Sequence, residues 1–146
     1  MALDDDIANL QSIALFEDFE IEALRLLTFS AETKLLRAGD ALFRRGDASD
    51  GGFILTHGSI ALEKHDDGRP AEKVLRPFTL IGEIALVTET TRPVTAIARE
   101  PATILKITRA LFLRILEEFP VTATRVRARV ATRLTRFAQE LKFEKT

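Results

Sequence analysis

The sequence predicts a mainly β, α+β domain: an antiparallel β-roll or jelly-roll barrel flanked by N-terminal helices and by two C-terminal helices. Three observations predict this fold class. Apolar residues recur with helical spacing near both ends of the chain, whereas residues 34–107 contain short apolar runs separated by turn residues. The length of 146 residues fits one domain. We therefore expect a single domain over residues 1–146, with helices at 1–33, the β-roll at 34–107 and helices at 108–146.

Helical spacing marks the N-terminal region, residues 4–29. Ile7, Leu10 and Ala14 recur at that spacing behind three aspartates, which favour the start of a helix because its first amides carry a partial positive charge. After Leu15-Phe16 comes a second apolar stripe, formed by Phe19, Ala23, Leu24 and Leu27. The region therefore predicts helix that is broken between the two stripes.

Short strands separated by turns are expected through the middle of the chain. The gaps between apolar runs contain turn signals such as Gly46-Asp47. The Asp67-Gly68 pair indicates a hairpin between the runs on either side of it. The runs are Leu35-Leu36, Leu42-Phe43, Phe53-Ile54-Leu55, Ile60 with Leu62, Val74-Leu75, Thr95 to Ala98, and Ile104 to Ile107. Strands of this kind predict an antiparallel sandwich or barrel.

Two helices are predicted after the last strand. Thr108 can cap the first helix, and Pro120 separates it from the second, because the residue before a proline avoids the α conformation. The first helix has apolar residues at Phe112, Ile115, Leu116 and Phe119. The second has an apolar seam at Val126, Val130, Leu134, Phe137 and Leu141. This seam fits either packing on the barrel or pairing with the same helix of a second copy.

Composition and charge exclude several classes of function. The chain has no cysteine, so it forms no disulfide, thiolate metal site or Fe–S cluster. No apolar run approaches the roughly 18–20 residues of a membrane span, and the acidic N-terminus does not resemble a signal peptide. We therefore expect a cytoplasmic protein without membrane contact. The net charge of −1 conceals a basic end, since residues 121–146 carry seven Lys or Arg and two Asp or Glu.

One segment, residues 80–95, interrupts the rhythm of strands and carries the candidate chemistry. A strand is expected to lead into Gly82, which permits close backbone approach to a ligand, and a short helical turn follows. The first amides of such a turn favour an anion, and Arg92, expected to begin the next strand, carries a guanidinium that matches phosphate. Glu83 supplies an acceptor for a sugar hydroxyl. The set suits a sugar phosphate; a surface Glu–Arg pair at a capped turn is the other interpretation.

The order of elements and this segment together resemble the cyclic nucleotide-binding domain of the catabolite activator family, protein kinase regulatory subunits and cyclic-nucleotide-gated channels. The resemblance covers roughly residues 10–142. Gly82-Glu83-Ile84-Ala85-Leu86, followed by Arg92 and Thr95, resembles the phosphate-binding cassette of that family. The residues that resemble its first helix and the glycine-punctuated half of its β-roll are Leu15-Phe16, Leu24, Gly39, Leu42, Gly46, Asp47, Phe53-Ile54-Leu55 and Gly58.

The resemblance implies a role for each cassette residue. Glu83 would accept a hydrogen bond from the ribose 2′-hydroxyl, and Arg92 would pair with the cyclic phosphate. The backbone amides of Ile84 and Ala85 would complete the anion site, and Gly82 would permit the turn. Thr95 is included in the same ligand-binding set. The expected base pocket comprises the barrel-wall residues Ile54, Leu62, Val74 and Leu75, with Arg129 and Thr132 as contacts from the C-terminal helix.

The sequence departs from the family pattern in two places. Pro93 follows Arg92, where the family usually has Ala, Ser or Thr with an amide that helps to hold the phosphate. Proline lacks that N–H, so we expect binding to be weaker by ~1–3 kcal/mol but retained. A Thr here favours guanine in relatives, so its absence favours cAMP over cGMP. The usual Pro-Gly before the cassette is replaced by Arg76-Pro77-Phe78-Thr79.

The expected function is that of a stand-alone sensor rather than an enzyme. It would bind cAMP, or cGMP as the second choice, without a cofactor or metal, and would signal by movement of its C-terminal helices to an effector protein or a second copy. DNA binding is not expected because no helix-turn-helix follows Leu141. The alternative, motivated by Pro93, is a degenerate β-roll that acts as a protein-interaction or dimerisation module and binds no nucleotide. A metal-dependent cupin enzyme ranks third, because His57 and His65 do not form a His-x-His pair.

Overall fold

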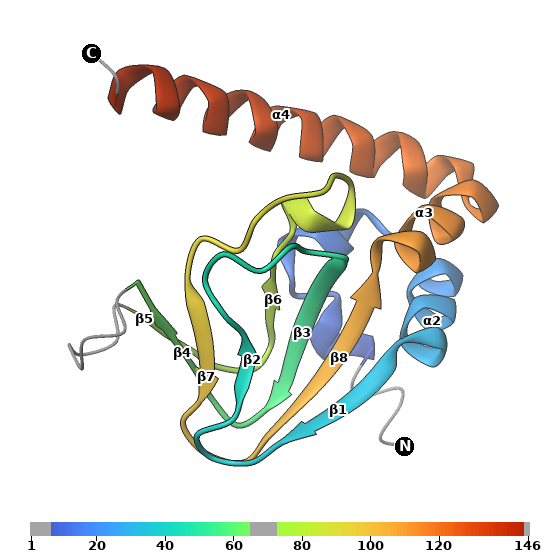
Figure 1. The fold of residues 1–146 in the computed structure, drawn as a ribbon. Helices are drawn as coiled ribbons and strands as arrows, with labels where there is room; N and C mark the ends of the chain where they lie inside the picture. The colour runs from blue at the N-terminus through green and yellow to red at the C-terminus, as the bar shows by residue number, and fades with distance from the viewer. Residues whose placement is uncertain (1–6, 65–72, 145–146) are drawn as a thin grey trace.

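The computed structural model describes residues 7–64 and 73–144, which form two β-sheets with helices against the outer side of one of them (Figure 1). The N-terminal part contains the 3-10 helix η1 (Ala14–Asp18) and the helix α2 (Ile21–Ser30). The break between them lies at Phe19 and Glu20, whose extended backbone separates the two helices. The N-terminal region is thus helical and interrupted as predicted, but the interruption at Phe19 and Glu20 lies within the second stripe and not between the two stripes.

Eight strands form the two sheets. Their bounds are β1 (Glu32–Leu36), β2 (Ala41–Phe43), β3 (Gly51–His57), β4 (Ile60–Glu63), β5 (Lys73–Leu75), β6 (Thr79–Ile81), β7 (Thr95–Ala98) and β8 (Ala102–Thr108). One sheet has the order β1-β8-β3-β6 and the other β2-β7-β4-β5, and every pairing is antiparallel. The predicted antiparallel β-roll with flanking helices is confirmed.

Two details around the strands bear on the predictions. The β4–β5 hairpin has Ile60 opposite Leu75, as the sequence indicates, whereas its expected tip at Asp67-Gly68 lies outside the described residues, as does His65. The expectation that Arg92 begins a strand is wrong, because β7 begins at Thr95. Instead, backbone hydrogen bonds hold Arg92 to the loop between β2 and β3. Its amide donates to Asp47 O in that loop at 2.8 Å.

The turn before β2 and the turn after it are built alike. Gly39 and Gly46 each have a φ of +93°, which residues with a Cβ rarely adopt. The aspartate that follows each glycine accepts a hydrogen bond from a backbone amide three residues before it: Arg37 N to Asp40 at 2.8 Å and Arg44 N to Asp47 at 2.9 Å. These turns fix the loops on both sides of β2, and the second one leads to the candidate site.

Two hydrophobic cores meet at β3. Successive side chains of a strand point to opposite faces, so Phe53 and Leu55 pack inside the β-roll while Ile54 packs against the helices. The core inside the roll also contains residues of both sheets: Phe43, Ile60, Leu75, Ile81, Ala96, Ala98, Ala102 and Ile104. The helix-side core is built around the fully buried rings of Phe16 and Phe112. The candidate site lies where these cores adjoin.

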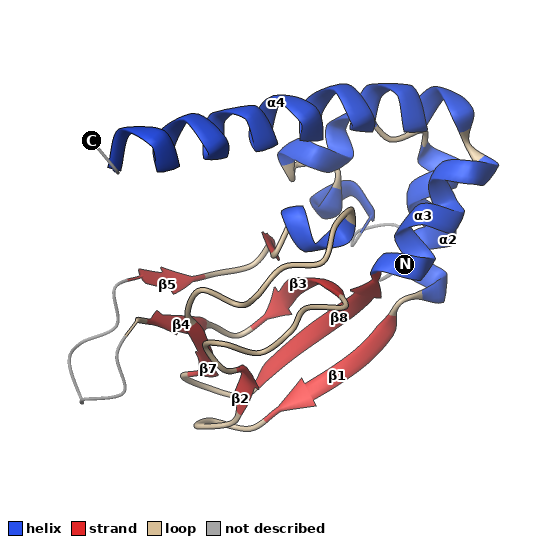
Figure 2. Cartoon of the chain, turned by 45° about the horizontal axis from the view of Figure 1, so that its top comes forward, coloured by secondary structure: helices blue, strands red, loops and turns tan. Residues whose placement is uncertain are grey.

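Two C-terminal helices, α3 (Arg109–Glu118) and α4 (Pro120–Glu144), follow β8 without a linker. The predicted cap of α3 is confirmed, since Thr108 Oγ1 accepts a hydrogen bond from Leu111 N at 3.1 Å. Helix α4 begins at Pro120 as predicted, and it continues beyond the other helices (Figure 2). None of the described helices has the length and apolar character that crossing a membrane requires.

The predicted seam of α4 is described only at its start. Val126 is fully buried in the helix-side core, together with Ala123. This burial supports packing of the first turns of α4 on the chain itself. The side chains of the other seam residues, Val130, Leu134, Phe137 and Leu141, lie outside the described part.

Candidate functional site

The cassette begins with a glycine turn after β6. Gly82 has a φ of +85°, and a Cβ added to it would lie only 2.6 Å from Nη1 of Arg92. The 3-10 helix η2 (Ile84–Leu86) follows, and its first hydrogen bond runs from Leu86 N to Glu83 O at 3.2 Å. The amides of Ile84 and Ala85 precede this bond, so they have no acceptor within this fully described helix. Glycine is therefore needed here both for backbone conformation and for the approach of Arg92.

A cavity of about 300 Å³ joins the cassette to the loop that precedes β7. It is lined by Gly82, Glu83, Ile84, Ala85, Thr90, Thr91, Arg92 and Pro93. The structure thus brings together five of the six residues expected to bind the ligand. Thr90 and Thr91 also line the cavity, although the sequence reasoning gave them no role.

Thr95 is the sixth expected residue and does not line this cavity. It is buried at the start of β7, and its Oγ1 accepts a hydrogen bond from Arg45 N at 2.9 Å. This bond holds the loop after β2 to β7. The described contact of Thr95 is therefore with the backbone of a neighbouring loop.

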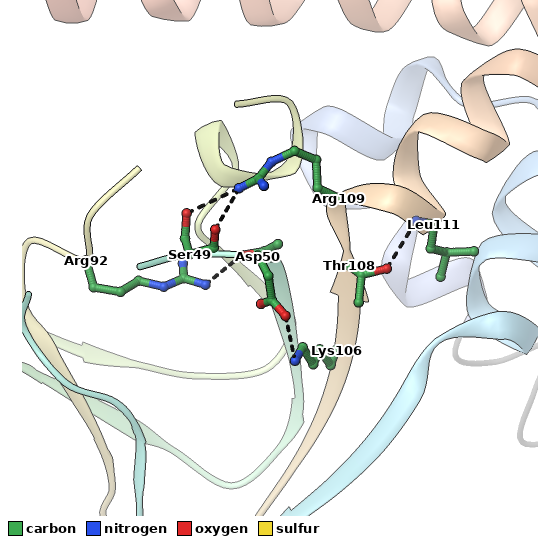
Figure 3. Close-up of polar contacts among 8 residues, drawn as sticks. Ser49, Asp50, Arg92, Lys106, Thr108, Arg109 and Leu111 are labelled. Atoms are coloured by element: carbon green, nitrogen blue, oxygen red, sulfur yellow. Dashed lines mark hydrogen bonds and ion pairs between the residues drawn. The ribbon is translucent and has the colours of Figure 1, made fainter. Parts of the chain in front are cut away.

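Arg92 lies inside the β-roll rather than on its surface. The residue is 5% exposed, and Nη2 donates a hydrogen bond to Gly51 O at 2.7 Å (Figure 3). Its guanidinium carbon lies 4.6 Å from the ring centroid of Phe43 and 5.3 Å from that of Phe53. These contacts place the cation over two aromatic faces. Arg92 therefore has a structural role besides any role in binding.

The charges around Arg92 only partly compensate for its burial. Burial is the main cause that lowers the pKa of its guanidinium; Asp50 opposes this shift, and the positive charge of Arg109 adds to it. Asp50 itself forms an ion pair with Lys106 at 3.0 Å, which lowers the pKa of that carboxyl. A buried guanidinium whose strongest carboxylate partner is also paired with a lysine favours an anion beside it.

The residues expected to hold a base do not share one surface. Leu75 is buried inside the β-roll, and Leu62 packs against the same core. Ile54 lies on the opposite face of β3, in the helix-side core, and so does not belong to the barrel wall. Val74 is half-buried and, as the neighbour of Leu75 in β5, points to the other side of its sheet. Leu62 and Leu75 remain as candidates for an apolar contact within the roll.

A second cavity, of about 410 Å³, lies on the helix side of the cassette. Gly82 and Glu83 line it together with Arg129 from α4, and Ile13, Ala14, Leu15, Phe78, Thr79 and Leu80 complete the lining. Arg129, expected to contact the base, therefore lines this second cavity and not the one that contains Arg92. Its Nε bonds Asp18 Oδ2 at 2.7 Å, and this hydrogen bond is the main cause that raises the pKa of Arg129.

Thr132 lies one turn further along α4, outside both cavities that contain Glu83. Its Oγ1 donates to Ala128 O at 3.1 Å, within its own helix. It lines a separate hollow of about 480 Å³ beside Asp18, Arg129 and Arg136. In this structure Thr132 is therefore not in contact with the cassette.

Sequence reasoning missed Arg109, the first residue of α3. Its guanidinium donates to Ala85 O at 3.0 Å, Thr88 O at 3.1 Å and Ser49 O at 2.8 Å. A signal was available in the sequence, because a cation in the first turn of a helix opposes the helix dipole, so its presence there indicates another interaction.

Among the described residues, no group of three or more His, Cys, Asp or Glu side chains could hold a metal ion.

Comparison with protein families decides the identity of this fold. The model of the cyclic nucleotide-binding domain matches residues 33–119, which include the β-roll from the second residue of β1 onward, the cassette and α3. The chain belongs to the cyclic nucleotide-binding domain family. This membership identifies a binding and regulatory domain rather than a catalytic one.

Solved structures support the assignment to the cyclic nucleotide-binding domain family. A cyclic nucleotide-binding-like protein from Brucella abortus is 43% identical, with a TM-score of 0.71, and the match covers 77% of this chain and 98% of that one. The N-terminal domain of a transcriptional regulator from Streptomyces coelicolor is 29% identical, with a TM-score of 0.76, over 87% of this chain and 90% of that one.

Curated relatives contain the cyclic nucleotide-binding domain within longer chains. A cAMP-dependent protein kinase regulatory subunit from Eremothecium gossypii is 29% identical over 70% of this chain and 22% of its own length. Lysophospholipase nte1 from Neurospora crassa is 26% identical over 78% of this chain and 8% of its own length. The present chain thus spans less than a quarter of either relative.

Proposed function

We propose that this cyclic nucleotide-binding domain binds cAMP in preference to cGMP and signals through its C-terminal helices. The observation that carries the proposal is the cavity of about 300 Å³ that is lined by Glu83, Ile84, Ala85 and Arg92. These groups offer a carboxylate for a sugar hydroxyl and several donors for a cyclic phosphate. The kinase regulatory subunit among the relatives, described as cAMP-dependent, supports the choice of ligand.

Two features set the strength of binding that we expect. Pro93 lines the cavity but has no N–H to donate, so the anion must rely on Arg92 and the η2 amides. Arg92 Nη2 already donates to Gly51 O, and a phosphate must share or replace that bond. The loss of one charge-assisted donor corresponds to about a tenfold to hundredfold weaker Kd than with a full donor set.

The preference for cAMP rests on position 93. The family resemblance associates a threonine there with selectivity for guanine, and this chain has proline. The apolar contacts offered by Leu62 and Leu75 do not distinguish the two bases by hydrogen bonding. We therefore expect cGMP to bind in the same cavity but more weakly than cAMP.

Signalling is assigned to α4 because its attachment to the domain is concentrated at its start. Thr122 and Glu20 bond each other reciprocally, with Glu20 N donating to Thr122 Oγ1 at 3.0 Å and Thr122 N to Glu20 Oε1 at 3.2 Å. The next polar contacts both involve Asp18: Arg125 Nη1 donates to its backbone oxygen at 3.5 Å, and Arg129 forms an ion pair with its carboxylate at 2.7 Å. A change at the cassette that altered these contacts would redirect the helix toward an effector protein or a second copy.

Isothermal titration calorimetry with cAMP and cGMP tests the proposal. We expect saturable binding of cAMP, weaker binding of cGMP, and at least about tenfold weaker binding of cAMP by the Glu83→Gln variant. Glu89→Gln is the matched control, because Glu89 is exposed in the same loop but does not line the cavity, and it should bind as the wild type does. Absence of both heat and thermal shift at millimolar nucleotide would contradict the proposal.

A degenerate β-roll that binds protein and no nucleotide is the second candidate function. The specific observation in its favour is that Arg92 is satisfied within the chain by Gly51 O and by the rings of Phe43 and Phe53. This function predicts no nucleotide binding in the same calorimetric experiment. It also predicts self-association or binding of a protein partner that depends on exposed residues of α4.

A further inference from the structure

Arg109 joins three separate parts of the chain through one side chain. Its Nε donates to Ala85 O at 3.0 Å, and its Nη2 donates to Ser49 O at 2.8 Å and to Thr88 O at 3.1 Å. Its backbone amide donates to Asp50 O at 2.7 Å. Arg109 therefore ties the start of α3 both to the cassette and to the loop that leads into β3.

The position of Arg109 is electrostatically unfavourable for helix α3 itself. The first turn of a helix carries a partial positive charge, and Thr108 already satisfies one of its free amides. The guanidinium does not interact with its own helix but reaches carbonyl groups on two other segments. These hydrogen bonds offset the unfavourable interaction of the guanidinium with the dipole of α3.

The same loop also holds the arginine of the candidate anion site. Arg92 donates to Gly51 O and Arg109 donates to Ser49 O, so two guanidinium groups bind carbonyls two residues apart (Figure 3). Asp50, between these carbonyls, is anchored to β8 through Lys106 at 3.0 Å. A displacement of Arg92 by an anion therefore acts on a segment that is directly bonded to α3.

We propose that Arg109 is a positioning residue that holds residues 85–88 of the cassette and the segment 49–51 to the first turn of α3. Because α4 follows α3 after Phe119, a cassette that moves on binding ligand carries α3 with it and shifts α4. The holding role concerns the ligand-free domain, whereas the transmission of movement rests on the proposed binding of a cyclic nucleotide.

Amide hydrogen exchange of the ligand-free domain tests the holding role. We expect the Arg109→Met variant to exchange the amides of residues 84–90 at least about tenfold faster than the wild type, and Arg109→Lys to fall between them. Arg114→Met is the control, because Arg114 is exposed on the same helix and pairs only with Glu118 among the contacts described, at 3.5 Å. Unchanged exchange of residues 84–90 in a folded Arg109→Met variant would overturn the proposal.

Electron–electron distance measurement tests the transmission. The chain has no cysteine, so nitroxide labels attach only at introduced ones, and Arg99→Cys and Ala131→Cys place them on exposed positions of the roll and of α4. We expect cAMP to shift the distance distribution in the wild type and in Arg114→Met. Arg109→Met should retain at least about a tenth of the affinity, yet lose most of the shift.

The outcomes separate this inference from the proposed function. If the wild type binds no nucleotide, the proposed function fails, and the exchange experiment alone decides whether Arg109 holds the cassette. If Arg109→Met binds cAMP and shows the wild-type distance shift, transmission through Arg109 is refuted although the proposed function stands. A variant that binds without the shift, with faster exchange of residues 84–90, supports both parts of the inference.

Discussion

The junction of the cassette with α3 and the part of α4 beyond Val126 are held in different ways. At the junction, Arg92 is 5% exposed and Arg109 bonds three carbonyls. Beyond Val126, the described attachment of α4 is the ion pair of Arg129 with Asp18, whose side chains are 33% and 29% exposed. The described residues further along, Ala131, Thr132, Thr135 and Arg136, are exposed.

This difference in attachment separates a firmly held region from one that is held by fewer and more exposed contacts. Buried, multiply bonded groups open only with a large share of the global unfolding free energy, whereas a helix held by partly exposed contacts changes position at low cost. A ligand can shift only an equilibrium between states that it binds differently. In the proposed function, the junction holds the ligand and α4 is the part that changes position.

The largest effect is expected from a change that breaks the junction at its backbone. A Cβ at Gly51 would lie 2.1 Å from Ile107 O in β8, so Gly51→Ala must push β3 and β8 apart. We expect a loss of about 3 kcal/mol in the free energy of unfolding, measured by urea denaturation. In Gly52→Ala the nearest atoms lie at 3.1 Å, so the loss should be clearly smaller. Equal losses would show that the contact of Gly51 with β8 is no tighter than the contact of Gly52 with the cassette.

The next largest effect is expected from Arg92→Met. This change leaves Gly51 O without its donor and removes the cation from the rings of Phe43 and Phe53. We expect about 2 kcal/mol lower stability in urea, in the absence of any ligand, because a buried carbonyl is left unsatisfied. Unchanged stability would mean that Arg92 serves binding alone, and the junction would then owe its rigidity to Arg109.

A smaller effect is expected where α4 is attached. Asp18→Asn removes the ion pair with Arg129, which is partly exposed and so contributes about 0.5–1 kcal/mol. Amide exchange in residues 131–136 should become faster, while exchange in residues 84–90 should not change. Glu17→Gln is the comparison: Glu17 is exposed beside Asp18 and, among the contacts described, acts on Arg129 through its charge alone, so its removal should have a smaller effect. Faster exchange in the cassette would show that the two regions are not independent.

The smallest effect is expected from the surface ion pair of the junction. The hydrogen bond from Lys106 lowers the pKa of Asp50 below 3.8 in the folded state. Its stabilisation is therefore present above the unfolded pKa and is lost as the pH falls through the lower, folded value. Because Asp50 is largely exposed, Asp50→Asn should cost less than about 0.5 kcal/mol at pH 6 in urea denaturation, and less at pH 3 than at pH 6. A larger difference at pH 3 than at pH 6 would contradict this sign.

Much of the fold could be predicted because local signals determine it. Gly46 with Asp47 marks a turn, Thr108 caps a helix and Pro120 begins another, and each of these acts within a few residues. The cassette is identified through the family resemblance, which the consecutive residues Gly82 to Leu86 carry together with Arg92. Such features depend on backbone conformation that the residue type itself favours.

The remaining features depend on contacts between distant residues. The face of β3 to which Ile54 points follows from the register of a whole sheet, and the register cannot be deduced from the alternation of an almost entirely apolar strand. Thr95 bonds Arg45, fifty positions away, and Arg92 bonds Gly51. No periodicity predicts pairs of this kind.

The hydrogen bonds of Arg92 and Arg109 to residues 49–51 end on main-chain oxygens, and this has a consequence for comparing sequences. Every residue type presents such an oxygen, so the acceptor side of the linkage can persist while positions 49 and 50 diverge. Correlated substitutions between the two sides are therefore not expected. In related chains, the linkage should be identified by an arginine at the position of Arg109, the first residue of α3, and by a glycine at the position of Gly51, where β3 and β8 lie close together.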